Sequence, residues 1–150
     1  MRVVLDTNIL VRSHANARGP ARELLLLLAG APEHSLLISP FIFQELERVF
    51  GYERIRTLSR LSDDEVQEYL RYLRSKDVAE TVFPGIAPRV VPDDEDDDPI
   101  VHTAVVGRAD VLCTVNKDFF ASEVVAYCQE RGILICTDVE LLQALRTVRE

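Results

Sequence analysis

The sequence lacks the features that mark several common classes of protein. Its three cysteines, Cys113, Cys128 and Cys136, are odd in number and lack the close spacing of a zinc site, so we expect reduced thiols in the core. The three histidines are equally scattered and favour packing or surface roles. The longest apolar block, residues 24–29, is far too short to cross a bilayer. These shortages argue against a zinc protein and against a membrane protein.

Other absences narrow the choice further. The N-terminus has no basic region followed by a hydrophobic signal segment, so we expect a cytoplasmic protein. No glycine-rich turn follows the first predicted strand, which disfavours a Rossmann dinucleotide-binding domain. The 150 residues, 47% of them hydrophobic, suit one domain spanning residues 1–150. The net charge of -8 opposes nonspecific binding to polyanions, although a bound divalent ion would reverse that repulsion locally.

Strand-like and helix-like segments alternate along the chain. The expected strands cover residues 2–6, 36–39, 80–83, part of 109–115, and 134–136. The expected helices cover residues 7–15, 20–29, 40–49, 54–60, 62–75, 99–108 and 139–147, with one more after residue 119. Such alternation predicts an α/β fold in three layers, in which helices cover both faces of a parallel sheet of four to five strands.

Acidic residues stand where several of these elements begin or end. Asp6 ends the first strand, Glu45 lies in the second turn of the helix 40–49, and Asp118 follows a later buried strand. In an open α/β sheet, ligands bind at the carboxyl ends of the strands, so we expect these acids to gather at one edge. Helix capping is the alternative explanation for Asp6.

Residues 93–98 form a run of six acids. For Asp93 to Asp97 a flexible, solvated loop is the preferred interpretation. Asp98 is expected to be the N-cap of the helix 99–108, with Pro99 at its first position, which would fix the Asp98 carboxylate at the sheet edge. Carboxylates crowded beside Asp6 would raise one another's pKa unless a cation compensated them, so the crowding predicts a metal.

Arginines follow Glu45 closely enough to border the same cleft, although a solvated helix face is the simpler interpretation. This group, with one tyrosine, comprises Arg48, Tyr52, Arg54, Arg56 and Arg60. A second group with the same two interpretations comprises Arg12, Arg18 and Arg22.

The order and spacing of these segments resemble the PIN-domain nucleases, and within them the stand-alone bacterial or archaeal toxins of toxin–antitoxin pairs (VapC-like ribonucleases). The resemblance covers nearly the whole chain and implies a single PIN domain. Its segments are Leu5-Asp6-Thr7-Asn8-Ile9-Leu10, Glu45 after Ser39-Pro40, Asp98-Pro99-Ile100 with Ala104, Gly107-Arg108-Ala109-Asp110, and Thr114-Val115-Asn116-Lys117-Asp118-Phe119.

The resemblance implies that Asp6, Glu45 and Asp98 bind metal and that Asp118 completes the catalytic set. Many members carry an aspartate where this chain has Asn116. Asn116 is expected to coordinate through its carbonyl oxygen without adding charge, so a second metal would depend more strongly on Asp118.

Supporting roles follow from the same resemblance. Thr7, Asn8 and Thr114 are candidates for holding carboxylates, waters or phosphate. The RNA-binding candidates are Arg48, Arg54 and Arg56. Oxygen ligands without histidine or thiolate favour Mg²⁺ or Mn²⁺, as one or two ions.

The expected activity is metal-dependent endonucleolytic cleavage of RNA by water, leaving the phosphate on the 5′ end of the downstream fragment. The resemblance also implies a small antitoxin partner and a homodimer. Two alternatives stay open, namely a PIN-like module that binds RNA or protein without cleaving, and a Mg²⁺-dependent phosphohydrolase for small esters. The second would prefer an Asp-x-Asp motif after the first strand, where this chain has Asp6-Thr7-Asn8.

Overall fold

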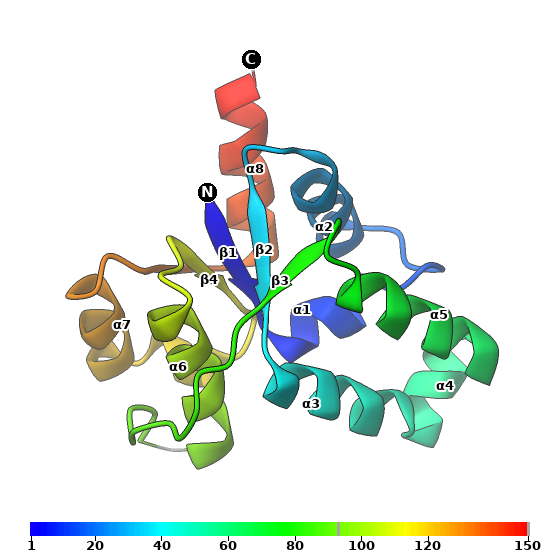
Figure 1. Ribbon diagram of the computed structural model, residues 1–150, viewed down its shortest axis with the longest axis horizontal. Helices are drawn as coiled ribbons and strands as arrows, with labels where there is room; N and C mark the ends of the chain where they lie inside the picture. The colour runs from blue at the N-terminus through cyan, green and yellow to red at the C-terminus, as the bar shows by residue number, and fades with distance from the viewer. Residues whose placement is uncertain (93, 150) are drawn as a thin grey trace.

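A parallel sheet of five strands, in the order β3-β2-β1-β4-β5, forms the centre of the molecule (Figure 1). The computed structural model describes residues 1–92 and 94–149, so the expectation for Asp93 lies outside the described residues. The strands are β1 (Arg2–Leu5), β2 (Ser35–Ile38), β3 (Ala79–Thr81), β4 (Val111–Cys113) and β5 (Leu134–Cys136). The predicted α/β fold with a covered parallel sheet is therefore confirmed.

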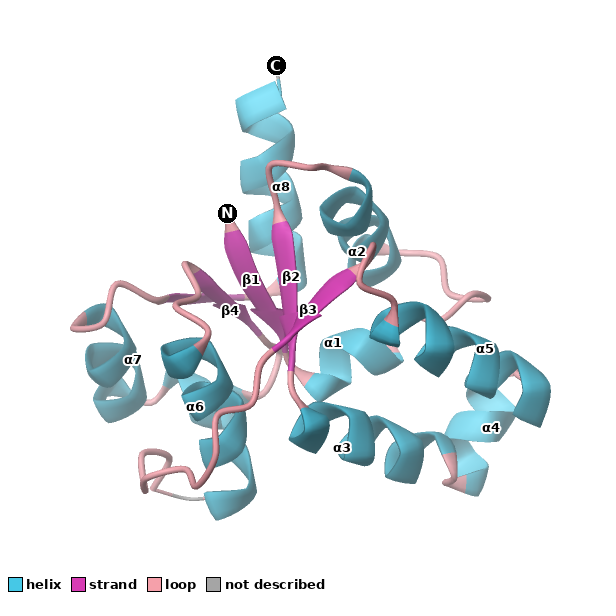
Figure 2. Ribbon diagram, viewed as in Figure 1, coloured by secondary structure: helices cyan, strands magenta, loops and turns pink. Residues whose placement is uncertain are grey.

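Helices pack on both faces of this sheet, with α6 and α7 together on one side and α1, α2 and α5 on the other (Figure 2). The α-helices are α1 (Thr7–Val11), α2 (Pro20–Gly30), α3 (Pro40–Phe50), α4 (Glu53–Ser59), α5 (Asp63–Arg74), α6 (Asp98–Val106), α7 (Ser122–Gln129) and α8 (Asp138–Arg149). Two 3₁₀ helices, η1 (Glu95–Asp97) and η2 (Lys117–Phe120), precede α6 and α7. The C-terminal helix α8 packs against α2.

Local sequence explains where most helices begin. Ser39 caps α3, where its hydroxyl accepts the Ile42 N–H, and Pro40 follows at the start of the helix. The predicted capping box is present at α5, because Ser62 and Glu65 each accept the other's backbone N–H. The helix predicted for residues 7–15 is wrong in length, since α1 ends at Val11. The chain then turns, and the buried Ser13 hydroxyl donates hydrogen bonds to the carbonyls of Ile9 and of Ala21 in α2.

The strands and one stripe of each helix supply the core. Val3, Val4 and Leu5 of β1 have no exposed surface, and burying each such side chain contributes about 1.5–3 kcal/mol. The three cysteines are free and buried, as predicted. Within the described residues, none of the helices has both the length and the hydrophobicity that crossing a bilayer requires.

The register of the strands places the first residues of the candidate site side by side. Leu5 of β1 pairs with Cys113 of β4, and Cys113 pairs with Cys136 of β5. The hydrogen-bond ladder continues one residue further, because Asp6 N–H donates to the Cys113 carbonyl and Thr114 N–H donates to the Cys136 carbonyl, both at 2.9 Å. Asp6 and Thr114 are thus fixed to the carboxyl end of the sheet by the backbone itself.

Candidate metal centre

Asp6 is buried, with 5% of its surface exposed. One carboxylate oxygen accepts the Thr7 N–H at 2.7 Å, and the other accepts the Thr114 hydroxyl at 2.7 Å. Burial raises the pKa of Asp6 to about 6, even though these two hydrogen bonds lower it, and the nearby charge of Glu45 adds to the rise. Asp6 therefore has a fixed orientation and only neutral hydrogen-bond donors.

Glu45 reaches the same place from α3, through Thr7. The Thr7 hydroxyl donates to Glu45 Oε1 at 2.6 Å, while the Thr7 backbone N–H serves Asp6. Arg48, one turn along α3, lies 3.4 Å from the other Glu45 oxygen. Burial raises the pKa of Glu45 despite both contacts. One threonine thus holds two carboxylates from different elements against each other.

Asp97 is the third acid in the pocket, where the sequence predicted a solvated loop residue. Its carboxylate accepts the Asn116 side-chain N–H at 3.1 Å. Burial raises the pKa of Asp97 to about 7, and the charges of Asp94, Asp6, Asp118 and Glu45 raise it further. The expectation of a merely solvated loop is therefore wrong for Asp97.

Asp98 faces a different part of the chain. One of its oxygens accepts the N–H groups of Val90 and Val91 at 2.9 and 2.7 Å, and the other lies 3.4 Å from Nε of Arg89. Asp98 is the first residue of α6 and Asp97 is the cap, so the prediction that Asp98 caps this helix is wrong.

The reason is that η1 runs directly into α6 and moves the helix start one residue earlier. Consecutive helical residues point about 100° apart, because a turn takes about 3.6 residues. Asp97 thus takes the place at the pocket that sequence reasoning gave to Asp98. The only hint in the sequence was that a helix accepts proline at any position of its first turn, so Pro99 does not fix the residue at which the helix begins. The metal-binding role of Asp98 stays a prediction.

Asn116 and Asp118 follow β4. Asn116 donates its backbone N–H to the Thr114 hydroxyl at 3.0 Å, and its side-chain oxygen accepts the Asp118 N–H at 3.0 Å. Its amide nitrogen is the group that faces Asp97. The structure therefore holds the Asn116 oxygen in a cap of η2, and its expected coordination of metal stays a prediction.

These acids form two adjoining sets that share Asp97. Carboxylate oxygens of Asp94, Asp97 and Asp118 all lie within 4.8 Å of one another. A pocket of about 380 Å³ adjoins them and is lined by Asp6, Thr7, Asn8, Val11, Arg12, Glu45, Val49, Ile55, Asp97 and Asn116. Such a set of hard oxygen donors fits Mg²⁺ or Mn²⁺.

One further group supports this fit. The side-chain oxygen of Asn8, in the same pocket, is buried and accepts no hydrogen bond from any described residue. A buried acceptor without a partner carries a desolvation cost, which a water or an ion in the pocket would remove.

The predicted arginines have separate surroundings. Arg48 pairs with Glu45, whereas Arg56 pairs with Asp63 of α5. Arg54 is exposed on α4 and forms no ion pair with any described residue. Arg12 lines the pocket directly, although the sequence placed it only in the second arginine group.

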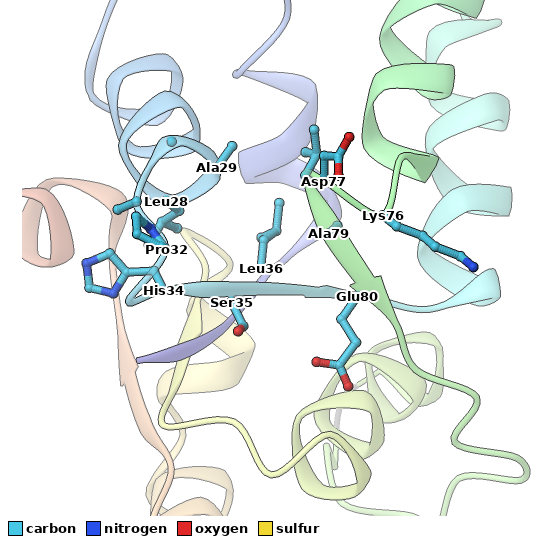
Figure 3. Close-up of a pocket in the computed structure, with 13 residues that line it drawn as sticks. Leu28, Ala29, Pro32, His34, Ser35, Leu36, Lys76, Asp77, Ala79 and Glu80 are labelled. Atoms are coloured by element: carbon cyan, nitrogen blue, oxygen red, sulfur yellow. The ribbon is translucent and has the colours of Figure 1, made fainter.

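Another cavity lies at the opposite end of the strands, where β2 begins at Ser35 and β3 begins at Ala79 (Figure 3). The charged side chains of Lys76 and Glu80 point in different directions there. Glu80 is already paired with Arg2 at 2.9 Å. This cavity therefore lacks the convergent polar groups that a catalytic site requires.

Comparison with known proteins identifies the family and the fold. The family model of the PIN domain matches residues 2–118. The VapBC2 complex of Rickettsia felis, solved bound to a DNA fragment from its promoter, aligns with a TM-score of 0.56 and 16% identity over 91% of this chain and 98% of that chain. A PilT N-terminus domain protein of the archaeon Sulfolobus solfataricus aligns with a TM-score of 0.50 and 14% identity, over 96% and 92%. No curated protein sequence matches the chain. At these identities the structural likeness establishes the fold alone.

Proposed function

Because the chain belongs to the PIN-domain family, we propose that it is an endoribonuclease that depends on Mg²⁺ or Mn²⁺. The observation that carries the proposal is the crowding of carboxylates at the carboxyl end of the sheet. Asp6, Glu45 and Asp97 line one pocket, Asp118 adjoins it, and burial raises the pKa of the first three. A divalent cation is the simplest group that balances such a cluster.

The four acids Asp6, Glu45, Asp97 and Asp118 would hold one or two ions. When bound, such an ion supplies a water of lowered pKa and stabilises negative charge on phosphate oxygens. The remaining residues orient these acids. Thr7 and Thr114 fix Asp6 and Glu45 by hydrogen bonds of 2.6–2.7 Å, and Asn116 directs its amide nitrogen to Asp97. No side-chain nucleophile is required.

The same proposal extends to the partners of the protein. The likeness to the VapBC2 complex supports a role as the toxin of a toxin–antitoxin pair. We propose that the protein acts as a homodimer in the cytoplasm. The antitoxin would be a small protein that presents a basic side chain to the acids, since complementary charge favours such docking. Arg48, Arg54 and Arg56 on α3 and α4 would contact RNA beside the pocket.

A cleavage assay tests the activity directly. The purified protein is incubated with a mixed pool of structured RNA and Mg²⁺, Mn²⁺ or EDTA, beside the Asp6→Asn variant. We expect discrete products with either metal, and no products with EDTA or with the variant. Equal cleavage by the variant would assign the activity to a contaminant and overturn the proposal.

A second candidate is a module that binds RNA or protein without cleaving it. The neutral Asn116 favours this reading, because it lowers the negative charge available to a second ion. Absence of cleavage, together with absence of Mn²⁺ binding by calorimetry, would support it over the nuclease.

A further inference from the structure

Arg12 places a positive charge at the acidic pocket. It ends α1, where its backbone N–H donates to the Asn8 carbonyl at 3.2 Å. Its side chain is 49% exposed, and it lines the pocket that also contains Asp6, Glu45 and Asp97. Among the described residues that line this pocket, Arg12 is the only basic one.

A buried aspartate from the far end of the chain holds the Arg12 guanidinium. Asp138 opens α8 and is 1% exposed. One of its oxygens accepts the Val139 N–H at 3.0 Å. The other lies 3.5 Å from Nη2 of Arg12 and accepts no hydrogen bond from any described residue. A buried carboxylate is costly without a charge partner, and Arg12 is the partner that the structure provides.

This arrangement differs from those of the other arginines near the site. The partner of Arg48 is Glu45, whose charge would be shared with any bound ion. The partner of Arg56 is Asp63, whose side chain is 90% exposed. Asp138 lies outside the acid cluster, so its hold on Arg12 does not depend on whether an ion is present. A guanidinium has five N–H donors, and one contact with Asp138 leaves most of them directed elsewhere.

We propose that Arg12 binds a phosphate of the RNA chain at the pocket and that Asp138 positions Arg12 for this contact. The inference rests on the proposed function, because it takes RNA as the ligand. Guanidinium groups bind phosphate oxygens through paired, charge-assisted hydrogen bonds. In a protein with a net charge of -8, such a fixed cation beside the metal site favours the approach of a polyanion. α8 would thereby take part in substrate binding, although it contributes no residue to the acid cluster.

Salt-dependent binding of a fluorescein-labelled single-stranded RNA tests the proposal. Anisotropy is measured with Ca²⁺ in place of Mg²⁺, since Ca²⁺ takes the same oxygen ligands with looser geometry. Arg12→Ala should weaken binding about tenfold and lower the slope of log K against log [salt] by roughly 0.7, the loss of one phosphate contact. Arg12→Lys should keep the slope. Arg71→Ala, which removes an exposed arginine of α5 that does not line the pocket, is the charge-matched control and should match the wild type.

Asp138→Asn tests the positioning role, because an asparagine can still accept the Val139 N–H while it loses the ion pair. It should weaken binding by a few-fold at an unchanged melting temperature, and add nothing once Arg12 is already alanine. Additive effects in the double variant would show that Asp138 acts independently of Arg12 and would overturn its positioning role.

Cleavage by the wild type, measured in parallel with Mg²⁺, separates this inference from the proposed function. If the wild type cleaves RNA but Arg12→Ala binds RNA as Arg71→Ala does, the inference is overturned and the proposed nuclease activity is retained. Binding that depends on Arg12 without any cleavage would support the inference and overturn the nuclease. Neither binding nor cleavage by the wild type would overturn both.

Discussion

The carboxylates at the two ends of the central sheet have different hydrogen-bond partners. At the amino end, Asp110 accepts the Arg2 backbone N–H at 2.8 Å, and Glu80 pairs with the Arg2 guanidinium at 2.9 and 3.2 Å. At the carboxyl end, Asp6 and Asp97 accept hydrogen bonds only from neutral groups. Glu80 thus has a cationic partner at the amino end, whereas Asp6 and Asp97 at the carboxyl end have none.

This difference separates acids that stabilise the fold from acids that are available for chemistry. Exposed pairs such as Arg2 with Glu80 contribute about 0–1 kcal/mol to stability. The crowded acids raise the free energy of the folded state whenever they are charged, as their raised pKa values indicate. Their arrangement is therefore explained by a ligand better than by folding.

The largest expected effect is on cleavage. Asp97→Asn should lower kcat by at least about 100-fold, because an amide supplies less charge to a metal than a carboxylate does. Asp110→Asn, at the amino end, should leave kcat at the wild-type value. Multiple-turnover cleavage of one RNA at saturating concentration measures both. A wild-type kcat for Asp97→Asn would show that the carboxylates at the two ends of the sheet do not differ in their importance for cleavage.

Asp98→Asn, measured beside them, decides the role that the family resemblance gave to Asp98. Its oxygen can still accept the N–H groups of Val90 and Val91, so the variant should fold. A loss of kcat equal to that of Asp97→Asn would establish Asp98 as a ligand; an unchanged kcat would leave that role to Asp97.

A smaller effect concerns stability. Asp98→Ala leaves the Val90 and Val91 N–H groups without their acceptor, which should lower the free energy of unfolding by about 1–3 kcal/mol. Urea unfolding followed by circular dichroism measures this change, with Asp98→Asn as the matched control. An equal stability for both variants would show that Asp98 does not anchor residues 89–91.

The crowded carboxylates also predict a pH dependence of stability. Burial raises the pKa of Asp6 to about 6 and that of Asp97 to about 7, so the folded protein without metal holds these protons to higher pH than the unfolded chain, in which an aspartate has its ordinary pKa of about 3.8. The folded state therefore binds more protons in this range, and its stability should fall as pH rises from about 4 to about 7. Thermal melts in EDTA measure the slope, which Asp97→Asn should reduce and saturating Mg²⁺ should oppose. A slope that is identical in Asp97→Asn would show that Asp97 does not titrate in this range.

The sequence alone was enough for the sheet and for part of the site. Asp6 and Glu45 could be predicted because each lies at a position set by local pattern, namely a strand end and the second turn of a capped helix. The choice between Asp97 and Asp98 could not, since it depends on η1 and on the N–H groups of Val90 and Val91.

The contact between Arg12 and Asp138 was beyond sequence reasoning for a similar reason. The two residues lie at opposite ends of the chain, and only the packing of α8 brings them together. Local pattern predicted the last helix at residues 139–147, and the structure begins it one residue earlier, at Asp138. The charge pair is a property of tertiary structure.

The backbone hydrogen bonds that continue the sheet beyond β1 and β4 hold one side of the site more firmly than the other. Asp6 and Thr114 hydrogen-bond to Cys113 and Cys136 as though they were still strand residues, so they can move only when the core opens. Residues 95–97 form the short 3₁₀ helix η1, which lies outside this ladder. If the protein binds RNA as proposed, we expect the Asp97 side of the site to adjust to the substrate while Asp6 keeps its position.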